Sequence, residues 1–177
     1  MSPSPRPLHG GRPDPLPAGP DQESVWEYPR PPALVRSTRL VEVRSPDGAA
    51  LLARTDRARR VLETSHPPTW YLPRADVADG VLVRSAAPAT TCEWKGRATS
   101  WDVVLEGGGR LEAAAWSYEA PTPRFADLAG AIAFAPAQVV ATVDGERVRA
   151  QEGGFYGGWV TDDVVGPFKG GPGTWGW

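Results

Sequence analysis

Three residues of this chain are our candidates for moving a proton or stabilising negative charge. His66 stands in the stretch ETSHPPTWYL, and histidine titrates near neutral pH, so it could act as a general base or orient a ligand. Tyr71 lies in the same stretch, and Lys95, between Trp94 and Gly96, could stabilise developing negative charge. We expect His66, Tyr71 and Lys95 to be catalytic if they share one cavity. The structural alternatives are a His66 that caps a short helix and a Lys95 that lies solvated in a turn.

Aromatic residues form a second group, which could line a groove for a flat or cationic ligand. The alternative for most of them is a β core, where aromatic rings commonly pack across strands. Strand alternation puts Trp70 and Tyr71 on opposite faces, so only one of them can line the groove, and either assignment fits the pattern. The candidate ligand-binding residues are Trp70, Trp94, Trp101, Trp116, Tyr118 and Asp76.

Cys92 is the only cysteine, so the chain can form no internal disulfide and no zinc site built on paired cysteines. We interpret it as a small buried residue, and a Cys92–His66 nucleophile pair would require their strands to be neighbours. The sequence contains no credible set of three or four metal ligands. GGPGTWGW lacks the Lys-Ser/Thr ending of a phosphate-binding loop. We therefore predict neither a metal nor a cofactor.

Charge and hydropathy argue against two classes of partner. The net charge of −2 gives no basic surface for nucleic acid. The apolar runs are too short to span a membrane, and the N-terminal residues lack the apolar segment of a secretory signal, which favours a cytoplasmic protein. Lys95 and Lys169 are the only lysines. We attribute the excess of arginine to a GC-rich genome rather than to phosphate recognition. Self-association stays open.

The elements that must position these residues are mostly short strands. Residues 34–44 alternate partially, and hairpin turns are predicted at 46–48, at 107–109 and at Asp144-Gly145. Residues 55–64 (TDRARRVLET) and 124–136 (RFADLAGAIAFAP) predict two short helices, the first of which is stopped by Pro67-Pro68. With about eight strands, this pattern indicates a mainly antiparallel β domain.

The two ends of the chain differ from this middle part. Residues 1–22 are rich in proline, and we predict a disordered tail there, followed by a single domain over 23–177. From about residue 151 the chain combines glycines with large aromatic rings. We expect that segment to wrap around the core with these rings as anchors: Phe155, Tyr156, Trp159, Phe168, Trp175 and Trp177.

Four phrases, in this order and spacing, resemble the bacterial family named domain of unknown function 427, which carries a putative nucleotidyltransferase label. They are ETSHPPTWYLPRADV, TTCEWKGRATSWDV, AAAWSYEAPTPRFADLAGAIAFAP and VVATVDGERV. ESVWEYPRPP and GWVTDDVVGPFKGGPGTWGW are similar to the long actinobacterial form. The resemblance covers roughly residues 23–177.

The resemblance implies a β-tent-like fold, in which two antiparallel sheets pack at an angle and open into a groove. Methionine sulfoxide reductase B, the ligand-binding domain of cereblon and yippee-like proteins share that fold. Many of these relatives hold zinc with two Cys-x-x-Cys pairs, which this chain lacks. The HPP motif followed by aromatic residues belongs to the family pattern and favours a role for His66.

These observations predict a protein that binds a small, partly flat molecule in an aromatic-lined groove, with an anionic ligand as one option. In one hypothesis it is a cofactor-independent lyase, cyclase or isomerase. In the other it is a binding or interaction module without chemistry. A nucleotidyltransferase comes third, because the sequence offers no acidic metal-binding group for phosphoryl transfer.

Overall fold

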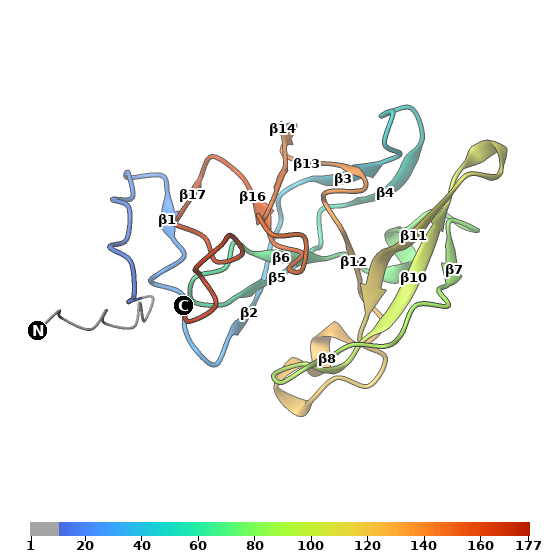
Figure 1. Cartoon of the computed structure of the whole chain (residues 1–177). Coiled ribbons are helices and arrows are strands. Elements are labelled where there is room, and N and C mark those ends of the chain that lie inside the picture. Colours follow the sequence, from blue (N-terminus) through green and yellow to red (C-terminus); the bar gives the residue numbers. More distant parts are fainter. Residues whose placement is uncertain (1–10) are drawn as a thin grey trace, which may run out of the picture.

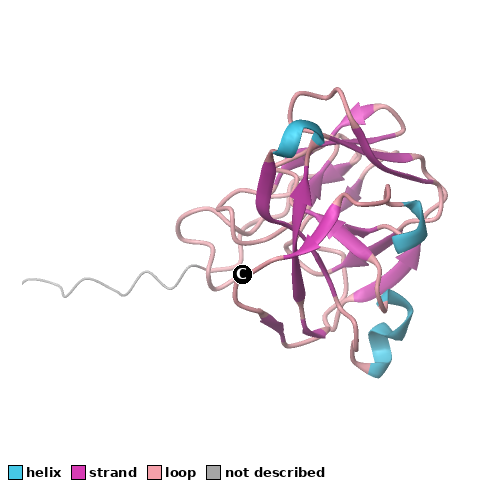
Figure 2. Cartoon of the chain, turned by 90° about the vertical axis from the view of Figure 1, so that its right-hand side faces the viewer, coloured by secondary structure: helices cyan, strands magenta, loops and turns pink. Residues whose placement is uncertain are grey.

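The computed structural model describes residues 11–177, which fold into several antiparallel β-sheets with very few helical residues (Figures 1 and 2). The predicted fold class, mainly β with antiparallel sheets, is confirmed. Two sheets have four strands each, in the orders β12–β11–β10–β7 and β14–β13–β3–β4. The strands of the first are β7 (Leu82–Arg84), β10 (Thr99–Val104), β11 (Arg110–Ser117) and β12 (Ile132–Phe134); those of the second are β3 (Val41–Arg44), β4 (Leu51–Thr55), β13 (Val140–Val143) and β14 (Glu146–Arg147).

A third sheet, of order β2–β5–β6, joins the first one edge to edge. The residue after β6, Leu72, exchanges two backbone hydrogen bonds with Ile132 of β12, at 2.7 and 2.8 Å. These two bonds tie the three-stranded sheet to the edge of the β12–β7 sheet. Its strands are β2 (Ala33–Arg36), β5 (Arg59–Leu62) and β6 (Thr69–Tyr71).

The remaining elements are short. Three two-stranded pairs and three 3₁₀ segments complete the described part of the chain (Figure 2). The pairs are β1 (Glu23–Ser24) with β17 (Val164–Val165), β8 (Thr91–Cys92) with β9 (Gly96–Arg97), and β15 (Arg149–Ala150) with β16 (Trp159–Val160). The 3₁₀ segments are η1 (Arg74–Asp76), η2 (Glu106–Gly108) and η3 (Pro123–Leu128).

The predicted hairpins are confirmed, because turn chemistry is local. β3 pairs with β4, β10 with β11, and β13 with β14. Asp144 and Gly145 both have positive φ, 49° and 83°, as a two-residue hairpin turn with the right twist requires. Residues 34–44 do not form one strand but belong to two, β2 and β3, which lie in different sheets.

The helix predicted over residues 55–64 is wrong, because residues 59–62 form β5. Its three apolar residues do not share a helical face: Ala58, Val61 and Leu62 pack into or against three different apolar clusters. Strand pairing on both sides of β5 therefore outweighs a weak helical preference.

The helix predicted over residues 124–136 is confirmed only in its first part. η3 buries Phe125 and Leu128. Ile132 is also buried, but as a residue of strand β12. Ala129, which follows η3, is exposed.

Three apolar clusters hold the sheets together. The largest lies between the two four-stranded sheets and includes Trp70, stacked on Trp159 at 6.1 Å between ring centroids. The second contains Tyr71 and Tyr118. Trp70 and Tyr71 thus face opposite sides of β6, as alternation predicts. The third packs Trp26 and Tyr28 near the C-terminal strand β17.

The C-terminal segment follows the core over a long distance. The backbone N–H of Trp159 donates to the Pro68 carbonyl, and that of Lys169 to the Ser65 carbonyl, each at 2.8 Å. Trp159 is fully buried, whereas Phe155 and Trp175 are 75% exposed and do not anchor the segment.

Part of the predicted N-terminal tail has a defined course. Residues 1–10 lie outside the described residues. Farther along, the Leu16 N–H donates to the Gly166 carbonyl at 2.9 Å, and Gln22 Nε2 donates to the Asp162 carbonyl at 2.7 Å. The segment 11–22 therefore lies along the C-terminal segment. Within residues 11–177, no helix has the length and apolar character needed to cross a bilayer.

Candidate anion-binding cleft

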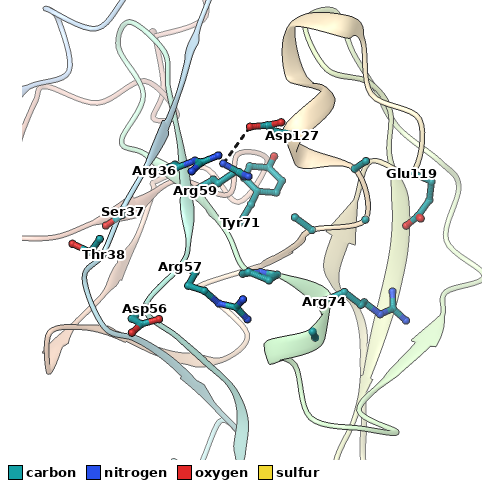
Figure 3. Close-up of a pocket in the computed structure, with 15 residues that line it drawn as sticks. Arg36, Ser37, Thr38, Asp56, Arg57, Arg59, Tyr71, Arg74, Glu119 and Asp127 are labelled. Carbon is teal, nitrogen blue, oxygen red and sulfur yellow. Dashed lines mark ion pairs between the residues drawn. The ribbon is translucent and has the colours of Figure 1, made fainter.

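A cleft of about 820 Å³ lies between the three-stranded sheet and the segment that carries η3 (Figure 3). Residues from β2, the β4–β5 turn, β5, β6 and η1 form one side, and residues that follow β11 and end η3 form the other. We call it the arginine cleft. Its lining residues are Arg36, Ser37, Thr38, Asp56, Arg57, Arg59, Tyr71, Pro73, Arg74, Ala75, Glu119, Asp127, Ala129, Gly130 and Ala131.

The strand register builds a row of polar side chains across one face of the sheet. Arg36 of β2 pairs directly with Arg59 of β5, and Arg59 pairs directly with Tyr71 of β6. Directly paired residues of antiparallel strands project to the same face, so two guanidinium groups and a phenol stand side by side (Figure 3). Like charges in such a pair repel each other unless an anion lies between them.

Carboxylates neutralise this row only in part. Arg59 Nη1 lies 3.4 Å from Asp127 Oδ2, which is the ion pair drawn in Figure 3. Among residues 11–177, Arg36 has no carboxylate within ion-pair distance. Arg36 thus offers a guanidinium that can bind an external carboxylate or phosphate in a bidentate manner, through two parallel hydrogen bonds.

Two further arginines complete the cleft. Arg57 Nη2 lies 2.6 Å from Asp76 Oδ1, and its guanidinium is thereby fixed in direction. Arg74 stacks over the ring of Trp101, with 4.4 Å from its Cζ to the ring centroid, and forms no ion pair within residues 11–177. Cation–π contact orients a guanidinium without neutralising its charge.

Asp76, predicted to contact the ligand, instead supports an arginine. Its Oδ2 accepts a hydrogen bond from Thr55 Oγ1 at 2.7 Å, and its Oδ1 accepts one from Arg57. The hydrogen bond from Thr55, followed by the one from Arg57, lowers the pKa of Asp76, so the carboxylate stays charged. It does not line the cleft itself.

Tyr71 forms the floor of the cleft and is almost fully buried. Its hydroxyl accepts a hydrogen bond from Trp116 Nε1 at 3.3 Å. Burial raises the pKa of Tyr71 well above its ordinary value, so the phenol keeps its proton. This chemistry suits a hydrogen-bonding floor better than a general base.

The structure divides the three predicted catalytic residues between two places. Tyr71 lines the arginine cleft, whereas His66 and Lys95 do not. Within residues 11–177, no hydrogen bond joins any two of the three; the side-chain partners of His66 and Tyr71 are Gln151 and Trp116. His66 precedes β6 and Tyr71 is its last residue, and the ring of Tyr118 lies 6.3 Å from the Tyr71 ring and 5.7 Å from Lys95 Nζ.

The predicted aromatic residues do not gather at one site either. Trp70 is buried in the largest cluster and has no access to the cleft, and Trp101 lies under Arg74 and donates from Nε1 to Ser117 Oγ at 2.8 Å. Trp94, Trp116 and Tyr118 belong to the second cluster, together with partly buried Cys92. None of these aromatic rings lines the arginine cleft or the smaller cleft beside Phe168 and Trp177 in the described residues.

Arg36, Arg57 and Arg59 are functional candidates that the sequence does not reveal, since its excess of arginine is attributed to genome composition. The sequence does contain one indication of this site. Arg36 lies two residues after Leu34 in a predicted strand, so both side chains project from the same face. Its partner could not be identified, however, without the register between β2 and β5. Within residues 11–177, His, Cys, Asp and Glu side chains form no group of three that could hold a metal ion.

An antiparallel β scaffold with an arginine-lined cleft thus defines the class of this protein. The chain belongs to the family described as domain of unknown function (DUF427), whose model matches residues 33–146, more than half of the chain. The match includes every residue that lines the cleft. No curated protein gives a significant match.

Proposed function

We propose that the protein binds a small anionic molecule, carrying a carboxylate or phosphate group, in the arginine cleft. The observation that carries this proposal is the direct pairing of Arg36 with Arg59, in which Arg36 has no carboxylate partner among the described residues. An anion bound between the two guanidinium groups replaces their repulsion with charge-assisted hydrogen bonds.

The size and the walls of the cleft agree with a ligand of metabolite size. A volume of about 820 Å³ falls within the range of roughly 300–1,000 Å³ that is usual for small-molecule sites. Tyr71 and Pro73 supply apolar surface on one side, and Ala129 and Ala131 do so on the other. These walls suit the flat part of a ligand whose acidic group meets Arg36 and Arg59.

The chemistry of the cleft favours binding without catalysis over a lyase, cyclase or isomerase. Its lining residues include no histidine, and Tyr71 keeps its proton. Asp127 is engaged by Arg59, and Glu119 Oε1 accepts a hydrogen bond from Ser117 Oγ at 2.5 Å. The nucleotidyltransferase stays the weakest alternative. The cytoplasmic location, the lack of a nucleic-acid partner and self-association stay predictions.

The proposal is tested by titrating the protein with inorganic phosphate, citrate and benzoate at low ionic strength, with calorimetry and thermal unfolding as readouts. Arg36→Gln should weaken binding by about 10- to 100-fold, because a hydrogen bond to a charged group contributes about 1.5–3 kcal/mol. Without ligand the same variant should be no less stable than the wild type, since it removes a repulsion.

Arg147→Gln provides the matched control, because Arg147 is an exposed strand arginine in the four-stranded sheet β14–β13–β3–β4. It should leave both ligand binding and stability unchanged. Binding of none of the three anions, or binding that is equally tight in Arg36→Gln and in the wild type, would overturn the proposal.

A further inference from the structure

A second group of polar side chains gathers at the other end of β6, away from the arginine cleft. It begins with the turn before this strand, where the His66 N–H donates to the Glu63 carbonyl at 3.0 Å. Glu63 Oε1 accepts a hydrogen bond from Trp94 Nε1 at 3.3 Å. This bond places the tip of the β8–β9 hairpin, which carries Lys95, against the turn that carries His66.

Lys95 is a buried lysine without a counter-charge. Its side chain is only 9% exposed, and Nζ lies 5.7 Å from the ring centroid of Tyr118. Within residues 11–177, Nζ has neither a carboxylate nor a hydrogen-bond acceptor. The surroundings of a mostly buried ammonium have a lower dielectric constant than water, so an anion that reaches this group gains a stronger partner than a fully solvated lysine.

The tip of Lys95 can be reached from solvent. The fully enclosed polar side-chain atoms without a hydrogen bond in the described residues are Tyr28 Oη, Arg60 Nε and Ser65 Oγ, and Lys95 Nζ is not one of them. Ser65, the neighbour of His66, is also held at a φ of 71°, which a residue with a side chain rarely adopts. Strained backbone of this kind concentrates at functional sites.

The hydrogen bonds of Gln151 fix the tautomer of His66. Gln151 Oε1 accepts from the Gly158 N–H at 3.2 Å, and Nε2 donates to the Lys169 carbonyl at 2.7 Å, so the orientation of the amide is determined. The same Nε2 lies 3.0 Å from His66 Nδ1, which must therefore accept. In the neutral ring the proton sits on Nε2, whose N–H has no acceptor among the described residues.

Charged groups from several elements keep the His66 ring neutral. Burial, and then the charges of Lys169, Arg30 and Lys95, lower the pKa of His66 to about 4. Both lysines of the chain thus act on one histidine. The carboxylate nearby, Glu63, is shared by Arg30 at 3.4 Å and by Trp94. The surroundings of the imidazole are therefore positive.

The C-terminal segment forms one wall of this group. The Tyr156 ring meets the His66 ring edge to face, with 4.6 Å between centroids. A Cβ at the next residue, Gly157, would lie 2.1 Å from Trp116 Cη2, so the backbone there is in close contact with the Trp116 ring. Aromatic rings therefore border the positive group from two elements.

We propose that Lys95 and His66 form a second anion-binding site, which takes a single carboxylate or phosphate group between the Lys95 ammonium and the His66 Nε2–H. This inference is independent of the arginine cleft. Both donors lack an acceptor within residues 11–177, and each lies beside an aromatic ring, His66 beside Tyr156 and Lys95 beside Tyr118. His66 is a binding residue here, since its neutral form donates the hydrogen bond.

The test follows the ring signals of His66 by NMR while the full-length protein is titrated with acetate and, separately, with phosphate. His66→Gln assigns the signals. Either anion should raise the pKa of His66 by about one, because a bound negative charge favours the imidazolium. A response to both anions identifies a general carboxylate and phosphate site, and a response to phosphate alone identifies a phosphate site.

Lys95→Met is the decisive variant, since it replaces the four-carbon stem with an unbranched apolar chain of similar length and removes the ammonium group. It should abolish the response to anions while slightly raising the pKa of His66 in their absence. Lys95→Gln serves the same purpose if the methionine variant fails to fold. Arg36→Gln, in the arginine cleft, should leave the His66 response intact, which separates this inference from the proposed function. Signals of His66 that ignore both anions, or a full response in Lys95→Met, would overturn the proposal.

Discussion

Whether an arginine of this protein can bind an anion depends on the residue that is paired with it across the sheet. The opposite faces of Trp70 and Tyr71 could be predicted from the sequence, because alternation along a strand is local. The pairing of Arg36 with Arg59 could not, because it depends on how two strands distant in sequence are matched. The same holds for His66, whose neighbours Gln151 and Lys169 arrive from the C-terminal segment.

The buried state of His66 predicts a stability that falls in mild acid. Its pKa is about 4 when folded and 6.5 when unfolded, so between these values the unfolded chain binds the proton and the folded protein does not. Stability should therefore be full above pH 6.5 and decline as the pH falls toward 4, by about 2–3 kcal/mol in total.

Urea unfolding at several pH values between 4 and 7 measures this loss. His66→Gln, which cannot titrate, should show a shallower dependence over that range, and carboxylates such as Asp76 account for the remainder below it. Parallel curves for the variant and the wild type would mean that His66 is accessible to protons in the folded state.

Short elements can be predicted from the sequence where characteristic turn residues bound them. They cannot be predicted where pairing with strands distant in sequence determines the structure. The Asp144-Gly145 hairpin depends on residues that adopt positive φ readily, so its sequence suffices. β5 is different, because Val61 and Leu62 are adjacent apolar residues that serve opposite faces of the sheet. An adjacent apolar pair is equally compatible with one side of a helix, and only β2 and β6 determine the outcome.

The close contact between Gly157 and Trp116 makes the C-terminal segment sensitive to a single methyl group. In Gly157→Ala the new Cβ would lie 2.1 Å from Trp116 Cη2, and the ring is held in place by its hydrogen bond to Tyr71. Overpacking of this kind costs about 1–3 kcal/mol. Hydrogen exchange should accelerate around residues 151–158, and the pKa of His66 should rise as Tyr156 moves away.

Gly109→Ala is the control for this substitution. Gly109 has an ordinary φ of −63°, and a Cβ there would meet Leu105 at a normal 3.5 Å. Its effect should stay within about 0.5 kcal/mol. Equal stability of the two alanine variants would show that the C-terminal segment gives way freely at Gly157.

At the scale of the whole molecule, the two ends of the described chain stabilise each other. β1 pairs in parallel with β17, and residues 11–22 lie along the segment that follows β16. The C-terminal segment then continues to the His66 turn, where Lys169 N–H donates to the Ser65 carbonyl. The predicted wrap is a structural part of the second anion-binding group, which links that group to the packing of both ends.

Trp26 joins the two ends of the described chain through its ring and its indole N–H. It is 7% exposed, its Nε1 donates to the Pro167 carbonyl at 2.9 Å, and its ring meets that of Trp177 at 5.7 Å. Trp26→Ala should reduce the free energy of unfolding by about 3–5 kcal/mol, as loss of a buried tryptophan does. Hydrogen exchange should accelerate together in residues 23–28 and 159–169, because the two segments share this contact.

Trp175→Ala removes an equally large ring that is 75% exposed, and should change stability by no more than about 0.5 kcal/mol. If Trp26→Ala loosened residues 23–28 and left 159–169 fully protected, the C-terminal segment would be held by Trp159 and the Ser65 turn alone.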